Sequence, residues 1–267
     1  MRDRLERYFQ LQAQGSTWRT ELLAAATMFI ASVYIVIVNP AILSQAGMAY
    51  EAVLTATVLV CTFSSITMGL YANNPILVAP GMGINAYFTY AVVLHKHIPV
   101  ATALGAVFWS GVIFLLLSIF KVRNKIIQAI PDNVRYGSAA GIGLFIALIG
   151  LFNAGFIVVK TPFIGLGELN SLTLTFVAGL VIAAVLTVKR VTGALILTVL
   201  LTTLLAYPIG RWYGDASAVN FGHAQLVLWD GWLAWPDFSL LFQLDLLGAW
   251  HWSVLPAAFW FIVYRYV

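Results

Sequence analysis

The chain has 267 residues, of which 61% are hydrophobic and 9% are charged, and its mean hydropathy is +0.93. Because soluble domains carry about 25% charged residues, this composition excludes a soluble globular protein. The formal net charge of +4 comes from basic residues that lie between apolar runs and form no stripe, which argues against a nucleic-acid partner.

Seven continuous apolar runs predict seven transmembrane helices, since a helix needs about 20 apolar residues to cross a bilayer. The one Asp, Glu, Lys, Arg or His within these runs is Glu21, at the edge of the first. The sequence therefore predicts an all-α polytopic membrane protein. The predicted spans are residues 20–38, 52–72, 75–94, 100–120, 136–157, 171–188 and 191–210, and an eighth begins near residue 247.

The 14 basic residues divide unequally between the two sides of the membrane. A cytoplasmic N-terminus leaves three of them outside, Lys96, Lys160 and Arg211, and places eleven inside. The positive-inside rule favours this orientation, so we expect a multi-pass protein of the inner (plasma) membrane with its N-terminus in the cytoplasm. The eleven are Arg2, Arg4, Arg7, Arg19, Lys121, Arg123, Lys125, Arg135, Lys189, Arg190 and Arg265.

The pattern divides the chain into four parts. These are a cytoplasmic lead at 1–19, the seven spans at 20–210, an external tryptophan-rich loop at 211–246 and an incomplete eighth span at 247–267. For the lead, an amphipathic helix on the inner leaflet and a solvated tail both remain open. The density of tryptophan in the loop is typical of a membrane–water interface.

Proline marks two further features of this organisation. Residues 121–135 carry four cations and a short apolar face, which predicts a cytoplasmic interfacial helix that ends at Pro131. Asn39 and Pro40 form a stop signal and predict the end of the first span.

The third span, 75–94, carries Pro80, Gly81 and Gly83 near its middle, which predicts a broken helix. Irregular backbone at membrane depth is tolerated where it is buried in protein or lines a polar cavity, and transporters use such breaks to bind substrate. The amide of Asn85 can donate and accept hydrogen bonds to a heterocycle, or cap the half-helix. The alternative is a glycine-rich packing kink, and the residues alone leave both open.

Catalytic and metal-binding patterns are missing from the sequence. It contains no Ser/His/Asp set, HExxH, GxSxG or intramembrane aspartate pair, so nothing indicates an enzyme. His95 and His97 have no third ligand nearby and do not predict a metal site. A proton-coupled carrier needs an intramembrane carboxylate or histidine, and the seven spans supply none.

Residues 79–90 carry a specific resemblance and read Ala-Pro-Gly-Met-Gly-Ile-Asn-Ala-Tyr-Phe-Thr-Tyr. This stretch resembles the azaguanine-type adenine/guanine/hypoxanthine permeases of the nucleobase-cation symporter superfamily, relatives of the xanthine and uracil permeases. Residues 38–43, 68–73 and 138–151 agree with the same family, and the likeness runs from about residue 7 to about residue 262.

The resemblance implies a proton-coupled purine carrier that needs no cofactor. It also implies that these residues form the seven-span N-terminal repeat of a fourteen-span, inverted-repeat transporter, plus the start of span 8. Gly83 and Asn85 match the family's substrate-site residues of the third span, with Gly81 and Ala86 beside them. The implied partners are a purine nucleobase, protons and the lipid bilayer; a homo-oligomer stays open.

The last five residues, 263–267, depart from the family. Members continue there into an acidic Phe-Asp-Thr-type motif, whereas this chain reads Val-Tyr-Arg-Tyr-Val. Codons permitted for these residues encode Phe-Ile-Asp-Thr when read one base along. We therefore expect a truncated or frameshifted product that does not transport purine alone. The alternatives are a uracil or xanthine permease and a non-transporting structural fragment.

Overall fold

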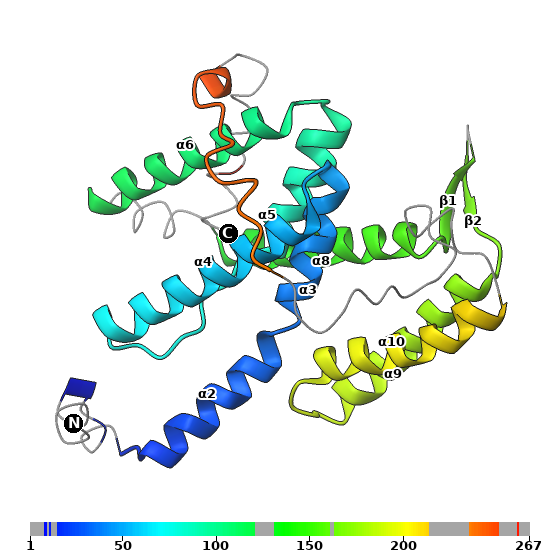
Figure 1. The fold of residues 1–267 in the computed structure, drawn as a ribbon, viewed down its shortest axis with the longest axis horizontal. Helices are drawn as coiled ribbons and strands as arrows, with labels where there is room; N and C mark the ends of the chain where they lie inside the picture. The colour runs from blue at the N-terminus through cyan, green and yellow to red at the C-terminus, as the bar shows by residue number, and fades with distance from the viewer. Residues whose placement is uncertain are drawn as a thin grey trace. The chain divides into compact units, whose positions relative to one another are not determined.

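The computed structural model describes residues 8–9, 11, 15–120, 131–160, 163–213, 235–250 and 261 (Figure 1). Most of these residues are helical. The α-helices are α2 (Trp18–Ser32), α3 (Ile35–Leu43), α4 (Tyr50–Tyr71), α5 (Met82–Ala86), α6 (Val100–Ile119), α8 (Asp132–Asn153), α9 (Ser171–Val188) and α10 (Ala194–Tyr213). A π-helix, η2 (Tyr87–His95), continues α5, and two short 3₁₀ turns are η1 (Ser44–Ala46) and η3 (Gly248–Trp250).

Five helical stretches of the described residues are long and apolar enough to cross a membrane, judged by length and composition. They are Trp18–Ala46, Tyr50–Tyr71, Val100–Ile119, Asp132–Asn153 and Ser171–Val188, and the shorter apolar stretch Ala194–Ile209 lies in α10. The expectation of a helical, polytopic membrane protein is confirmed. The repeat relationship implied by the family resemblance stays a prediction.

The first span differs from the prediction in two ways. A turn at residues 33–34 separates α2 from α3, and α3 continues through Pro40 to Leu43. The expected stop at Asn39 and Pro40 is therefore wrong. Pro40 lies in the second turn of a short helix, where its missing N–H removes a single bond, to the carbonyl of residue 36.

The fifth span begins and ends four residues earlier than predicted, at Asp132 and Asn153. α8 ends at Asn153, Gly155 adopts a φ of +68°, and the chain then forms a β-hairpin, whereas the apolar pattern predicts a helix up to residue 157. The hairpin pairs β1 (Ile157–Lys160) with β2 (Phe163–Leu166) in antiparallel register, with Ile157 opposite Leu166. The β-branched residues after Gly155 favour a strand, although their hydropathy resembles that of a transmembrane helix.

Parts of the predicted organisation lie outside the described residues. These are residues 1–7, 121–130, 214–234, 251–260 and 262–267, which hold most of the interfacial segment, most of the external loop and most of the eighth span. Residues 132–135, the part of the predicted interfacial segment that follows Pro131, form the first turn of α8, where Arg135 pairs with Asp132.

The described chain divides into two compact units. Unit 1 comprises Met1–Ile37, Val58–Ala79 and Leu151–Leu233; unit 2 comprises Val38–Thr57, Pro80–Gly150 and Ala234–Val267.

In unit 1, α9 and α10 form a tightly packed helical hairpin. The side chain of Asn170 caps α9 by accepting a 2.9 Å hydrogen bond from the Thr173 N–H. Gly179 allows the two helices to approach closely, since a Cβ there would lie 2.8 Å from Oγ1 of Thr202. Gly193 turns the chain between the helices with a φ of +75°.

Unit 2 holds the main apolar core of the described residues. η2 contributes Phe88 and Val92, and α6 contributes Ala103 and Ala106, all of them buried. Phe261 is 1% exposed, and its ring lies edge-on to that of Tyr87 with centroids 5.4 Å apart. The π-helix of the third span is therefore anchored by packing along its inner face.

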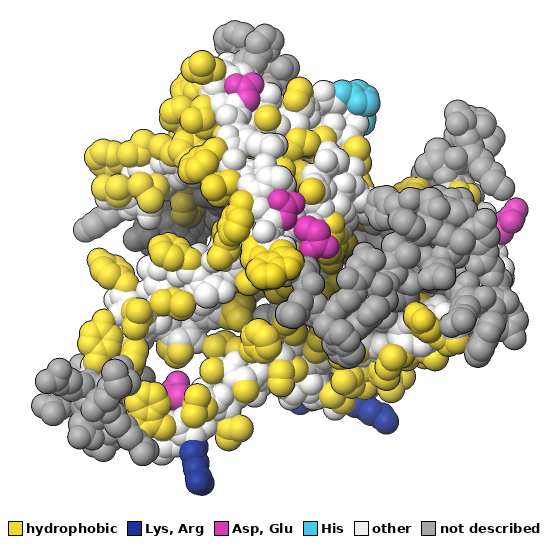
Figure 2. All heavy atoms as spheres, viewed as in Figure 1, with side chains coloured by type: hydrophobic (Ala, Val, Ile, Leu, Met, Phe, Trp, Pro, Cys, Tyr) yellow, Lys and Arg dark blue, Asp and Glu magenta, His cyan; other side chains and the backbone are white. Residues whose placement is uncertain are grey.

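Hydrophobic side chains cover most of the described surface in Figure 2, and charged side chains appear at only a few places. Large apolar residues at the middle of predicted spans are exposed, as Leu144 of α8 shows with 73% exposure. A soluble protein seldom exposes so much apolar surface, whereas a bilayer stabilises it.

Candidate functional site

The third span is non-helical up to Gly81 and helical from Met82 onward. Residues 73–81 form no helix, and α5 begins at Met82 after Gly81, whose φ of −76° and ψ of 114° are extended. The backbone N–H groups of Ile84 and Asn85 both donate to the carbonyl of Gly81, at 3.1 and 3.2 Å. Within the described residues, the N–H groups of Met82 and Gly83 have no hydrogen-bond partner. They are the free donors that a helix start offers to a ligand.

The short helix α5 that follows the break continues into the π-helix η2. Its side chains form hydrogen bonds to the end of the first span: the Thr89 hydroxyl donates to the Ile42 carbonyl at 3.3 Å, and the Tyr90 hydroxyl donates to Oε1 of Gln45 at 2.7 Å. π-helical segments occur frequently at functional sites. The broken span is thus fixed to the first span on the side that follows the break.

A buried chain of polar side chains joins three spans. Nδ2 of Asn85 in α5 donates to Oδ1 of Asn39 in α3, whose Nδ2 donates to Oγ1 of Thr57 in α4 at 2.8 Å. The Thr57 hydroxyl donates in turn to the carbonyl of Val53 at 2.7 Å. Asn39 and Thr57 are each 3% exposed. Since burying an unpaired amide is costly, this chain has to form as a unit.

Two residues of this series of hydrogen bonds, Asn39 and Thr57, are not predicted as site residues by the sequence. Asn39 was interpreted as part of a stop signal, and Thr57 was not singled out. One signal was present: Asn39 and Asn85 are amides within otherwise apolar spans, and a buried amide needs a partner. The partner's identity depends on how the spans pack, which the sequence alone does not give.

The four predicted site residues occupy different environments. Gly81 is exposed, and a Cβ there would meet nothing closer than 3.9 Å. Gly83 packs against α8, because a Cβ there would lie 2.5 Å from Cγ2 of Ile142. Asn85 is half-buried, and Ala86 is 1% exposed. Gly81 and Asn85 can therefore contact a ligand without rearrangement, whereas Gly83 and Ala86 also serve the packing of unit 2.

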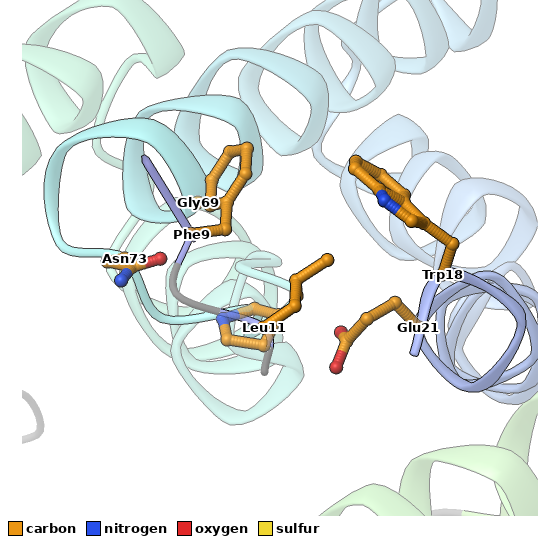
Figure 3. Close-up of a pocket in the computed structure, with 7 residues that line it drawn as sticks. Phe9, Leu11, Trp18, Glu21, Gly69 and Asn73 are labelled. Atoms are coloured by element: carbon orange, nitrogen blue, oxygen red, sulfur yellow. The ribbon is translucent and has the colours of Figure 1, made fainter. Parts of the chain in front are cut away.

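A pocket of about 180 Å³ lies elsewhere, within unit 1 (Figure 3). Figure 3 shows the Trp18 and Glu21 side chains, from the start of α2, at one side of it. Oε1 of Glu21 accepts a 2.5 Å hydrogen bond from the Ser16 hydroxyl, and Nε1 of Trp18 is buried without a partner among the described residues. None of the four predicted site residues lines this pocket, whose walls are Phe9, Leu11, Trp18, Glu21, Gly69, Asn73 and Pro75.

The described residues contain no group of three or more His, Cys, Asp or Glu side chains that could hold a metal ion. The break itself presents backbone N–H groups and the amide of Asn85, which form hydrogen bonds. Such groups recognise the edge of a neutral polar molecule.

A family model described as the Permease family, of the xanthine and uracil type, matches residues 19–261. The adenine permease AdeP of Escherichia coli (strain K12) is 43% identical over 208 residues, which are 77% of this chain and 47% of AdeP. The guanine/hypoxanthine permease PbuO of Bacillus subtilis (strain 168) is 42% identical over 220 residues, or 80% of this chain and 51% of PbuO.

A third relative, the guanine/hypoxanthine permease GhxP of Escherichia coli O157:H7, is 35% identical over 264 residues, which are 95% of this chain and 56% of GhxP. The chain thus spans about half the length of the curated relatives it matches.

Proposed function

The chain belongs to the permease family whose model it matches over residues 19–261, and on this premise we propose that it forms half of a purine nucleobase carrier. It is a multi-pass membrane protein and a permease, not an enzyme. The proposed cargo is adenine, guanine or hypoxanthine, and the proposed driving force is the proton gradient, with no cofactor.

The break at Gly81 is the observation that supports this proposal most strongly. It leaves two backbone N–H groups free at the start of α5 and places the Asn85 amide one turn later. Discontinuous helices with free N–H groups form the substrate sites of many transporters. A planar nucleobase presents N–H, N and C=O groups along its edges, which match these donors and this amide.

The proposal places the coupling carboxylate outside the seven predicted spans. Within them Glu21 is the one acidic residue, at the edge of the first. A proton carrier needs an acid or histidine within the membrane, so the proposal draws it from the part of the relatives' length that this chain does not match. The proposed location is the inner membrane, with the N-terminus in the cytoplasm.

The test is uptake of radiolabelled adenine, guanine and hypoxanthine in cells that lack their own purine carriers. The whole 267-residue chain is joined to the part of AdeP that it does not match, and uracil and xanthine serve as competitors. We expect saturable purine uptake that an uncoupler abolishes. A fusion that inserts normally but shows no saturable uptake would overturn the proposal, and competition by uracil or xanthine alone would favour a permease of that selectivity.

Gly81→Ala is the sharpest variant for the site itself. Its backbone angles suit alanine and the space around it is open, so a lower affinity would report the ligand rather than the fold. Gly141→Ala is the matched control, because a Cβ at Gly141 in α8 meets nothing within 4 Å. We expect weaker uptake affinity in the first variant and unchanged affinity in the second.

A further inference from the structure

The hydrogen bonds that run from Asn85 through Asn39 and Thr57 to Val53 have a direction. The Val53 carbonyl, at the end of this series, sets that direction. A backbone carbonyl can only accept, so the Thr57 hydroxyl must use its single hydrogen to donate to the Val53 carbonyl. Oγ1 of Thr57 can then only accept from Asn39. The atom of Asn39 that faces Thr57 is therefore Nδ2, at 2.8 Å.

The same reasoning fixes the direction of the hydrogen bond between Asn39 and Asn85 of the broken span. With Nδ2 of Asn39 committed to Thr57, its Oδ1 is the atom that faces Asn85, and it requires a donor. Asn85 meets this need with Nδ2. Its own Oδ1 has no partner among the described residues, so Asn85 keeps an acceptor that is not consumed by the fold.

The reversed arrangement is possible but weaker. If Thr57 donated to Asn39 instead, both amides would turn over and Oδ1 of Asn85 would be consumed, leaving Asn85 only donors. That arrangement loses the bond from Thr57 to the Val53 carbonyl. One net hydrogen bond corresponds to a preference of about 2- to 10-fold for the observed direction.

We propose that Thr57 and Asn39 are positioning residues that hold Asn85 with Oδ1 as an acceptor for a ring N–H of the transported nucleobase. This inference rests on the proposed function and deepens it, since it states which kind of ligand atom Asn85 recognises. Thr57 acts through Asn39 and does not itself touch the ligand.

Competition by two sets of hypoxanthine analogues tests the proposal in the AdeP fusion. In one set a ring nitrogen is methylated, which removes a donor; in the other a ring nitrogen is replaced by C–H, which removes an acceptor. Inhibition constants are measured for the unmodified fusion and for the Asn85→Ala variant. The comparison cancels any clash of the methyl group that does not involve Asn85.

We expect one methylated analogue to lose about 2- to 10-fold in affinity in the unmodified fusion and to lose less in Asn85→Ala. Thr57→Val, which has the same shape without the hydroxyl, should reduce the same discrimination. Thr57→Ser, which keeps the hydroxyl, should retain it. Membrane abundance and thermal stability of each variant are measured alongside, so that a folding defect is recognised.

Three results would overturn the inference. In the first, Asn85→Ala discriminates against every methylated analogue as strongly as the unmodified fusion does. In the second, Asn85→Ala changes the affinity of the acceptor-deleted analogues alone. In the third, Thr57→Val weakens all analogues equally. In each of these the unmodified fusion still takes up purine, so the proposed function stands. Absence of any saturable purine uptake would instead contradict the proposed function, and this inference with it.

Discussion

The side-chain amide of Asn85 donates a hydrogen bond to the side-chain oxygen of Asn39, a residue that lies 46 positions earlier in the chain. The two asparagines belong to the first and third spans, and Thr57 of the second span completes the link. In a membrane the alternative to such a bond is an amide without a partner, so the link contributes to both the position of the break and the stability of unit 2.

Removing either asparagine should therefore destabilise the protein. We expect Asn39→Leu to lower the free energy of unfolding by about 1–3 kcal/mol, because Nδ2 of Asn85 is left without its acceptor. The double variant Asn39→Leu/Asn85→Leu should lose less than the sum of the two single variants. Thermal unfolding of the detergent-solubilised protein measures this; strictly additive losses would contradict the link.

Gly83→Ala should be destabilising by about 1–3 kcal/mol, since its Cβ would lie 2.5 Å from Cγ2 of Ile142. Adding Ile142→Ala removes that atom, and we expect the double variant to recover most of the loss. The same unfolding assay applies, with Gly81→Ala as a control of unchanged stability. A Gly83→Ala protein as stable as the parent would show that α5 and α8 do not pack closely here.

Asp245 should act as a clamp between the segment before η3 and the start of α6. Its Oδ1 accepts from the Gly248 N–H at 2.8 Å, and its Oδ2 accepts from the Thr102 hydroxyl at 3.2 Å. We expect Asp245→Ala to cost about 0.5–2 kcal/mol, as for other capping residues, and Asp245→Asn to cost less. Equal losses in the two variants, measured by thermal unfolding, would exclude this role.

The division of basic residues predicts the topology. In a Cys61→Ser background, a single cysteine placed within 121–135 should react with a membrane-impermeant thiol reagent only from the cytoplasmic side. A cysteine within 213–238 should react only from outside. Labelling of both positions from one side would refute the seven-span orientation.

Five of the seven spans that hydropathy predicts correspond to long apolar helices of the described residues, because a bilayer requires continuous apolar helices. Hydropathy predicts their ends less well. Pro40 is compatible with a helix that began only five residues earlier, and Gly155 begins a hairpin whose β-branched residues are as apolar as a transmembrane helix. These outcomes depend on local backbone bonding, which a hydropathy pattern does not report.

The candidate site shows the same limit. Pro80 and Gly81 indicate the break directly, because proline and glycine change the backbone itself. The link from Asn85 to Asn39 and Thr57 depends on the angle at which three spans meet, and no spacing in the sequence encodes that angle. The contact of Gly83 with Ile142 is a second example of this limit. Close packing and ligand approach both favour glycine, so the residue type alone does not show which of the two it serves.

The π-helix η2 also affects how the broken span can move. Each π turn closes its hydrogen bond one residue later than an α turn, so the segment Tyr87–His95 contains more residues per turn than an α-helix of the same height. Conversion of one such turn to α geometry shifts the register by one residue, which is a rotation of about 100° about the helix axis. Asn85 would then face a different direction relative to His95, the π bonds of that turn would be exchanged for α bonds, and the bond from Asn85 to Asn39 would be lost. A π-to-α conversion within η2 would therefore link the direction of Asn85 to the backbone geometry of the segment that follows it.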